Sequence, residues 1–144
     1  MKEKARLPTR PPAREKTVRS HEFRIKRVYD PPAADDGLCF LVDRLWPRGV
    51  PKKAIARAEW TRGVAPSSAL RKWFGHEPSK WSEFRRRYRA ELQANPSAWE
   101  PLEKAVQSDN VTLLYAARDT KINHAVALKE YLEEKSAVRN QKPD

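Results

Sequence analysis

Two short stretches of this 144-residue chain place charged side chains directly after runs of apolar residues. An acid and a base follow the run CFLV at residues 39–42, and a second such pair follows VTLLYAA at residues 111–117. Guanidinium groups bind carboxylates and phosphates through paired hydrogen bonds, and a carboxylate can orient an arginine or exchange a proton. The candidate site residues of these two stretches are Asp43, Arg44, Trp46, Arg48, Tyr115, Arg118, Asp119 and Asn123.

If the two apolar runs are neighbouring parallel strands, their charged ends meet at one edge of the sheet, where open α/β sheets bind ligands. Arg44, Arg48 and Arg118 would then converge on an anionic group, a phosphate or a carboxylate. Either aspartate would orient an arginine or act as acid or base, and the tryptophan would form a wall. The pattern therefore predicts a site for a small anionic molecule, with catalysis left open.

Purely structural roles are also open for these residues. Asp43 and Arg118 could form a buried ion pair at the sheet edge, and Asp119 or Thr120 could cap the last helix. The group as a whole favours a ligand site, because burying charge is costly and buried charge tends to mark function.

The histidines are weaker candidates. His76 precedes a helix in FGHEP and is a candidate catalytic acid or base, although a local hydrogen-bonding role suits it equally. His124 lies in the first turn of the last predicted helix, where a solvent-facing side chain is the simpler expectation. The sequence has no metal-ligand spacing and only four glycines, too few for a phosphate-binding glycine loop, so we expect neither a metal nor a cofactor.

The net charge of +11 suggests a polyanion partner until the charges are located. Residues 1–20 carry seven Lys or Arg against two Glu, whereas residues 21–134 carry twenty against sixteen acids. An alternative function is therefore nucleic-acid binding through a basic arm and an Arg-rich helix with Arg85, Arg86 and Arg89, although a solvated helix face is the simpler interpretation. A second alternative is a non-catalytic protein-interaction module with exposed aromatic residues.

The chain is predicted to be one domain with two polar ends. We expect a disordered Pro/Arg arm over 1–21, a single domain over 22–135 and a disordered tail over 136–144. Alternating elements, and apolar strands without a polar face, predict a three-layer α/β sandwich with about four mostly parallel strands and helices on both faces. Expected strands cover 23–29, 39–46, 54–61 and 111–117, and expected helices cover 65–74, 77–93, a segment from a capping box at 97–100 or from Trp99, and 121–134.

The strand order is open, and the first two strands could pair antiparallel. The single cysteine, Cys39, allows no internal disulfide, and no apolar run approaches the roughly 20 residues that span a bilayer. We therefore expect a cytoplasmic protein with no membrane partner. The oligomeric state is left open.

Four motifs together resemble the YeaO-like family, the domain of unknown function 488. They are RVYDPP, LVDRLWPRGV, the stretch APSSALRKWFGHEPSKWSEFRRRYRAEL and VTLLYAARDTKINHA, and they run in order from about residue 23 to 133. The resemblance implies a compact cytosolic α/β protein and no established activity. It also points to the positions from Asp43 to Gly49, to those from Tyr115 to Asn123, and to His76.

Overall fold

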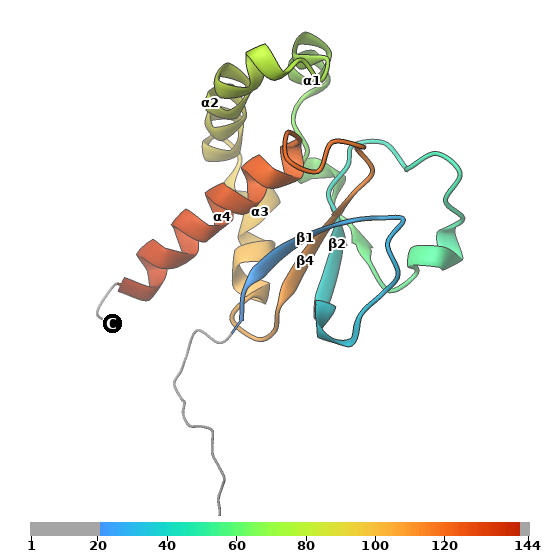
Figure 1. Ribbon diagram of the computed structural model, residues 1–144. Coiled ribbons are helices and arrows are strands. Elements are labelled where there is room, and N and C mark those ends of the chain that lie inside the picture. The colour runs from blue at the N-terminus through green and yellow to red at the C-terminus, as the bar shows by residue number, and fades with distance from the viewer. Residues whose placement is uncertain (1–20, 142–144) are drawn as a thin grey trace, which may run out of the picture.

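The computed structural model describes residues 21–141, which form a four-stranded parallel sheet with four α-helices (Figure 1). The strands lie in the order β1, β4, β2, β3, and every neighbouring pair is parallel. β1 and β2 are therefore not antiparallel partners, because β4 lies between them. The arm predicted over residues 1–21 lies outside the described residues except for its last residue, His21. The strand bounds are β1 Phe23–Arg27, β2 Leu38–Leu41, β3 Glu59–Trp60 and β4 Val111–Tyr115.

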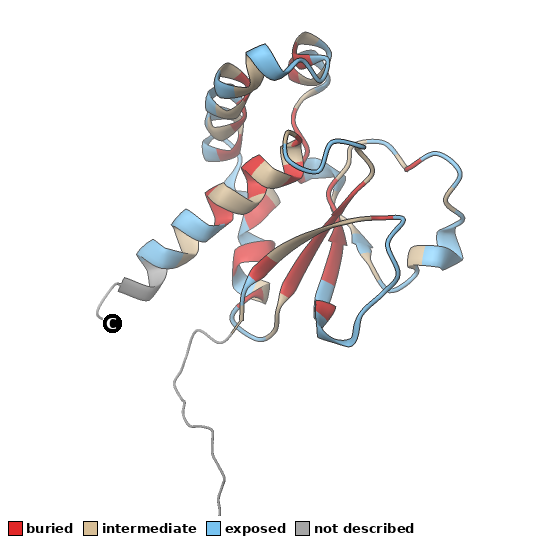
Figure 2. Ribbon diagram, in the orientation of Figure 1, coloured by how far each residue is buried: buried red, intermediate tan, exposed pale blue. Residues whose placement is uncertain are grey.

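The two central strands are apolar on both faces because both faces of the sheet are covered. Along β4, Val111, Leu113 and Tyr115 pack in the larger core, and Leu114 packs in a smaller core on the opposite face. Figure 2 shows this buried centre of the sheet. Strands covered in this way read as continuous apolar runs in the sequence, which is the signal that predicted a small parallel α/β sandwich. That prediction is confirmed.

All four α-helices contribute to the larger core on one face of the sheet. α4 packs on β1 and β4, and α2 and α3 pack on α4. The other face is covered by the β2–β3 segment (residues 42–58), which holds the short 3-10 turn η4 (Lys52–Ile55) and no α-helix (Figure 1). The third layer is therefore an irregular segment. The helix bounds are α1 Ser68–Phe74, α2 Trp81–Gln93, α3 Pro96–Ala105 and α4 His124–Gln141.

Several predicted boundaries differ from the structure for local reasons. The strand expected over 54–61 is reduced to Glu59–Trp60, because η4 occupies residues 52–55. α3 begins at Pro96, which has no N–H to satisfy in the first turn, so the predicted capping box is wrong. α4 runs to Gln141 because no Gly or Pro interrupts it, so the tail expected from residue 136 is helical to Gln141.

Ser67 caps the N-terminus of α1. Its Oγ accepts a hydrogen bond from Leu70 N–H at 3.1 Å. Glu91 of α2 holds the same serine, with its carboxylate accepting from Ser67 N–H at 2.9 Å and from Oγ at 2.6 Å. These bonds fix the start of α1 against α2 and so position the next turn of α1 at the carboxyl end of the sheet.

Candidate functional site

The Asp43 side chain takes the place of a backbone acceptor at the carboxyl end of β2. Val42 N–H donates to Leu114 O at 3.0 Å, and one further step of the parallel ladder would place Ala116 N–H on the Val42 carbonyl. Ala116 N–H instead donates to Asp43 Oδ2 at 3.0 Å. The backbone pairing stops at this point, which explains why an acid follows the apolar run.

The Val42 carbonyl that leaves the ladder binds His124, the first residue of α4. His124 Nε2 lies 3.1 Å from Val42 O and 3.1 Å from Asp43 Oδ1. Both neighbours are acceptors, so Nε2 carries a proton and Nδ1 is the ring nitrogen that can gain or lose one. The geometry at Oδ1 is not that of a hydrogen bond, so the bond goes to Val42 and the contact with Asp43 is electrostatic. The expectation of a solvent-facing histidine is wrong, since the His124 side chain is only 15% exposed.

These groups border a pocket of ≈ 180 Å³ at the carboxyl ends of β2 and β4. The pocket is lined by the residues that follow β2, by Pro66 and α1, by α2, and by the segment from β4 into α4. Pro66, Phe74 and Phe84 provide apolar walls. The polar lining residues are Asp43, Arg44, Arg71, His76, Asn123 and His124.

The two arginines that line this pocket differ in their hydrogen bonding. The Arg44 guanidinium is fixed by carbonyls, with Nε donating to Pro66 O at 3.0 Å and Nη2 to Ala65 O at 3.3 Å. Arg71 of α1 presents a buried Nε that has no hydrogen-bond partner among the described residues. An unmet buried donor costs about 1–3 kcal/mol, so Arg71 favours an added acceptor.

Sequence reasoning missed Arg71, although a signal was available. Leu70 and Phe74 mark the buried stripe of α1. Residues three apart on a helix share a face, so Arg71 is turned to the same side as Phe74. Sequence reasoning also missed the apolar walls of the pocket, because their phenylalanines lie in helices and not at the charged strand ends.

Asn123 both lines the pocket and caps α4. Its Oδ1 accepts from Val126 N–H at 3.0 Å, and its Nδ2 donates to Asp119 O at 2.7 Å. The side chain is 1% exposed, and these bonds fix its orientation. A ligand contact through Asn123 therefore stays a prediction.

Asp119 supports the loop before α4 and does not line the pocket. Its Oδ1 accepts from Ile122 N–H at 2.9 Å and Lys121 N–H at 2.8 Å. These two bonds, and a smaller effect of His76, lower the pKa of the Asp119 carboxyl. A structural role in the loop before α4 therefore fits Asp119 better than a role as acid or base. His76 is exposed at the pocket with φ 59, a conformation uncommon outside glycine.

Four further predicted residues lie away from the pocket. Trp46 is on the opposite face, where its Nε1 donates to Val50 O at 2.6 Å, so it is not a wall of this pocket. Arg48 and Arg118 are exposed and form no ion pair within residues 21–141, so the expected convergence of three arginines is wrong. Tyr115 is in the core, where burial raises its pKa. Trp46 and Arg48 miss the pocket because β2 ends at Leu41 and the chain that follows it crosses to the opposite face of the sheet.

The four arginines of α2 form ion pairs with three glutamates, because Glu83 is shared by Arg86 and Arg87. The ion pairs with Glu83 hold the pKa of that carboxyl at about 2, and the exposure of these pairs makes them weak contributors to stability. Each arginine thus has a local acidic partner, which weakens the support for an Arg-rich nucleic-acid face. The pairs are Arg85–Glu130 at 2.8 Å, Arg86–Glu83 at 2.6 Å, Arg87–Glu83 at 2.7 Å and Arg89–Glu134 at 2.7 Å.

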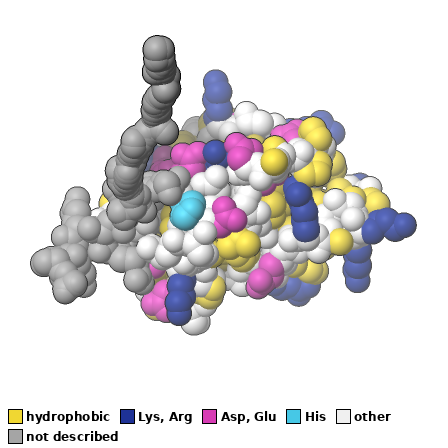
Figure 3. Space-filling model, turned by 90° about the horizontal axis from the view of Figure 1, so that it is seen from below, with side chains coloured by type: hydrophobic (Ala, Val, Ile, Leu, Met, Phe, Trp, Pro, Cys, Tyr) yellow, Lys and Arg dark blue, Asp and Glu magenta, His cyan; other side chains and the backbone are white. Residues whose placement is uncertain are grey.

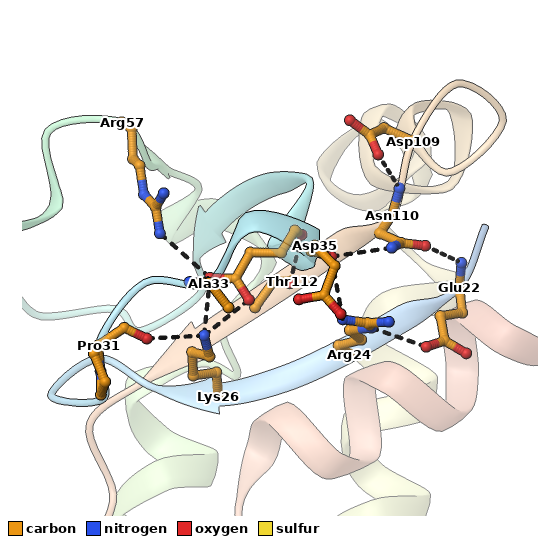
Figure 4. Close-up of polar contacts among 11 residues, drawn as sticks. Glu22, Arg24, Lys26, Pro31, Ala33, Asp35, Arg57, Asp109, Asn110 and Thr112 are labelled. Atoms are coloured by element: carbon orange, nitrogen blue, oxygen red, sulfur yellow. Dashed lines mark hydrogen bonds and ion pairs between the residues drawn. The ribbon is translucent and has the colours of Figure 1, made fainter.

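A second charged cluster, centred on Asp36, is saturated by its own partners (Figure 4). The Asp36 carboxylate is buried and accepts from Lys26 Nζ at 2.8 and 2.9 Å, from Ala33 N–H at 2.9 Å and from Arg57 at 3.3 Å. Burial raises the pKa of Asp36, but the hydrogen bonds and positive charges of these partners outweigh it and the net pKa is lowered. The cluster therefore fastens the β1–β2 connection to the sheet.

Within residues 21–141, no three His, Cys, Asp or Glu side chains are grouped so as to hold a metal ion. The same part of the chain has no helix with the length and apolar character needed to cross a membrane. The polar side chains of the candidate site are those of arginine, histidine, aspartate and asparagine.

Comparison with known proteins places the chain in a family. Residues 22–144 match the family described as the inactive DUF488-N3 subclade. The chain belongs to this subclade. This DUF488 chain is 43% identical over 107 residues to the uncharacterized protein YeaO of Escherichia coli (strain K12), which covers 74% of this chain and 93% of that protein. The YeaO-like resemblance is therefore confirmed.

Mycobacterial proteins are also similar to this chain over most of its length. The chain is 38% identical over 115 residues to the uncharacterized proteins Mb3100c of Mycobacterium bovis and Rv3073c of Mycobacterium tuberculosis, covering 80% of this chain and 97% of each relative. No solved structure matches the chain. These relatives are themselves described as uncharacterized, so a function for this chain has to be inferred from the pocket.

Proposed function

We propose that this DUF488 protein binds a small anionic ligand in the pocket at the carboxyl end of its sheet. The observation that carries the proposal is the buried, unpartnered Nε of Arg71 in a pocket that also contains the Arg44 guanidinium. Two arginines line the pocket with a single carboxylate, Asp43, whose Oδ2 accepts from Ala116 N–H and whose Oδ1 has no hydrogen-bond partner among the described residues. The charge balance thus favours a carboxylate or phosphate group beside Arg71.

The size and walls of the pocket narrow the ligand class. A volume of ≈ 180 Å³ is about six times the share of one liquid water, so the ligand is a small metabolite rather than a dinucleotide. Phe74, Phe84 and Pro66 suit a short apolar body attached to the anionic group. A bulky or wholly polar anion would leave these walls unmatched.

We propose binding without turnover as the primary role. The pocket-lining residues include no Ser, Thr or Cys side chain to serve as a nucleophile, and the family is described as inactive. The Asp43–His124 contact favours a second candidate, proton exchange with the ligand through His124 Nδ1. Replacement of His124 by Gln would remove that chemistry, whereas a binding role through Arg71 would persist.

The proposed function is compatible with a reducing compartment. Cys39 is a buried free thiol, and burial raises its pKa, which makes it a poor nucleophile. We propose a cytoplasmic location, in keeping with a thiol that has no second cysteine in the sequence to pair with.

A thermal-shift screen of the full chain against phosphate, nucleoside monophosphates, sugar phosphates and small carboxylic acids tests the proposal. A ligand at about 100 times its dissociation constant stabilises the fold by about 2.7 kcal/mol, which raises the melting temperature by roughly 10 °C. Arg71→Gln should abolish the shift. Lys72→Gln removes the same charge from the exposed neighbouring residue of α1 and should leave the shift intact.

Folding and binding effects of Arg71→Gln can be separated. Because the Arg71 Nε has no partner among the described residues, its removal should not lower the stability of the ligand-free chain. If no anion shifts the wild-type melting temperature, or if both variants bind alike, the pocket is not an anion site.

A further inference from the structure

The β2–β3 segment carries the most concentrated group of unmatched positive charges in the part of the chain that the structure describes. Between Arg44 and Ala58 the sequence holds five cations and no acid. Arg44 is turned into the pocket, and Arg57 pairs with Asp36. The exposed side chains of Arg48, Lys52 and Lys53 form no ion pair with any residue of 21–141. This state contrasts with the arginines of α2, each of which has a glutamate partner.

The segment is irregular in backbone but firmly attached to the sheet. Trp46 Nε1 donates to Val50 O at 2.6 Å, and Trp60 Nε1 donates to Asp43 O at 2.8 Å. The two indoles meet edge to face with centroids 5.2 Å apart and pack with Ile55 on the smaller core. The backbone that carries these charges is thus fixed before a partner arrives, which lowers the entropy lost on binding. Figure 3 shows Lys and Arg side chains gathered at the right-hand end of the molecule, where Figure 1 places this segment.

An aromatic ring borders these cations. Tyr29 is 49% exposed, and its hydroxyl donates to the Arg48 carbonyl at 3.4 Å. The Arg27 guanidinium lies 4.7 Å from the centre of the ring. A cationic track beside an exposed ring is the arrangement with which proteins bind single-stranded nucleic acid, because the cations contact phosphates and the ring stacks on a base.

We propose that Arg48, Lys52, Lys53 and Tyr29 form a binding surface for single-stranded nucleic acid. A lipid surface is the less suitable partner, because membrane-binding elements present aromatic and aliphatic side chains outward. Among the large apolar side chains of residues 42–58, Leu45 is exposed and borders the anion pocket, whereas Trp46 is packed on the sheet beside Trp60 of β3. The surface is separate from the anion pocket and stands whether or not that pocket binds a metabolite.

The test is fluorescence anisotropy of the full chain with labelled dT20 and rU20 over a range of salt concentrations. The variant Arg48→Gln/Lys52→Gln/Lys53→Gln should bind at least tenfold more weakly. Each lost phosphate contact on a single strand lowers the slope of log K against log salt by about 0.7, so the slope should fall by about two. Tyr29→Ala should weaken binding about tenfold with an unchanged slope.

A scattered triple variant, Lys72→Gln/Lys104→Gln/Lys121→Gln, removes the same charge from exposed sites that form no ion pair within the described residues. It should bind as wild type does. Equal weakening by both triple variants would show that only total charge matters and would overturn the proposal. Wild-type binding to anionic vesicles of phosphatidylserine and phosphatidylcholine without binding to either oligonucleotide would overturn it as well. Matching melting temperatures exclude unfolding as the cause of any loss.

Discussion

Replacement of Asp43 by Ala tests whether the Asp43 carboxylate serves, in place of a backbone carbonyl, as the hydrogen-bond acceptor at the end of β2. The change removes the acceptor of Ala116 N–H at 3.0 Å and the carboxylate 3.1 Å from His124 Nε2. The Asp43 side chain is 14% exposed, so water replaces it incompletely. An unmet donor costs about 1–3 kcal/mol, and we expect a loss of about 2 kcal/mol in the free energy of unfolding. For a chain of this size that corresponds to a melting temperature lower by about 8 °C.

Urea unfolding at pH 7 followed by tryptophan fluorescence measures this loss. Glu59→Ala is the matched control, because Glu59 is an exposed acid on the neighbouring strand β3 and should change stability by less than about 0.5 kcal/mol. Asp43→Asn adds a second comparison. Asparagine keeps an oxygen for Ala116 N–H but turns its amide donors toward His124 Nε2, which already donates to Val42. If Asp43→Ala matches Glu59→Ala, the carboxylate does not complete the ladder.

Two further variants test the attachment of the β1–β2 connection to β4. Gly37→Ala would place a Cβ 2.2 Å from Asn110 O at a φ of 69, so we expect at least about 2 kcal/mol of destabilisation in urea, whereas Gly63→Ala meets nothing within 4 Å and should be nearly neutral. The folded-state pKa of Asp36 lies below its ordinary value of 3.8, so its ionised form stabilises the fold above that pH and the contribution is lost as the pH falls through the folded pKa. Asp36→Asn should therefore be less stable than wild type at pH 7, with the gap closing below about pH 4. A gap independent of pH would mean that the charge of Asp36 is not what its partners stabilise.

The parallel sheet was predictable because its physical cause is local. VTLLYAA and CFLV lack a polar face, and a strand of that kind requires cover on both sides. A serine cap at Ser67 or Ser68 was likewise predictable, since a serine before an apolar helical stripe supplies the missing acceptor. What covers the second face was not predictable, because the β2–β3 segment has no helical or strand period and is held by two indoles that hydrogen-bond to backbone carbonyls.

The sequence by itself determined that charge follows two buried strands, and it led to the expectation that Asp43, Arg44 and Asn123 lie near the carboxyl edge of the sheet. Only the tertiary structure decided which charges meet. Arg48 leaves the edge because β2 stops at Leu41, and Arg71 enters from a helix that no strand-end pattern includes. The physical reason is that strand ends are set by local backbone pairing, whereas a pocket is set by how helices distant in sequence pack above them.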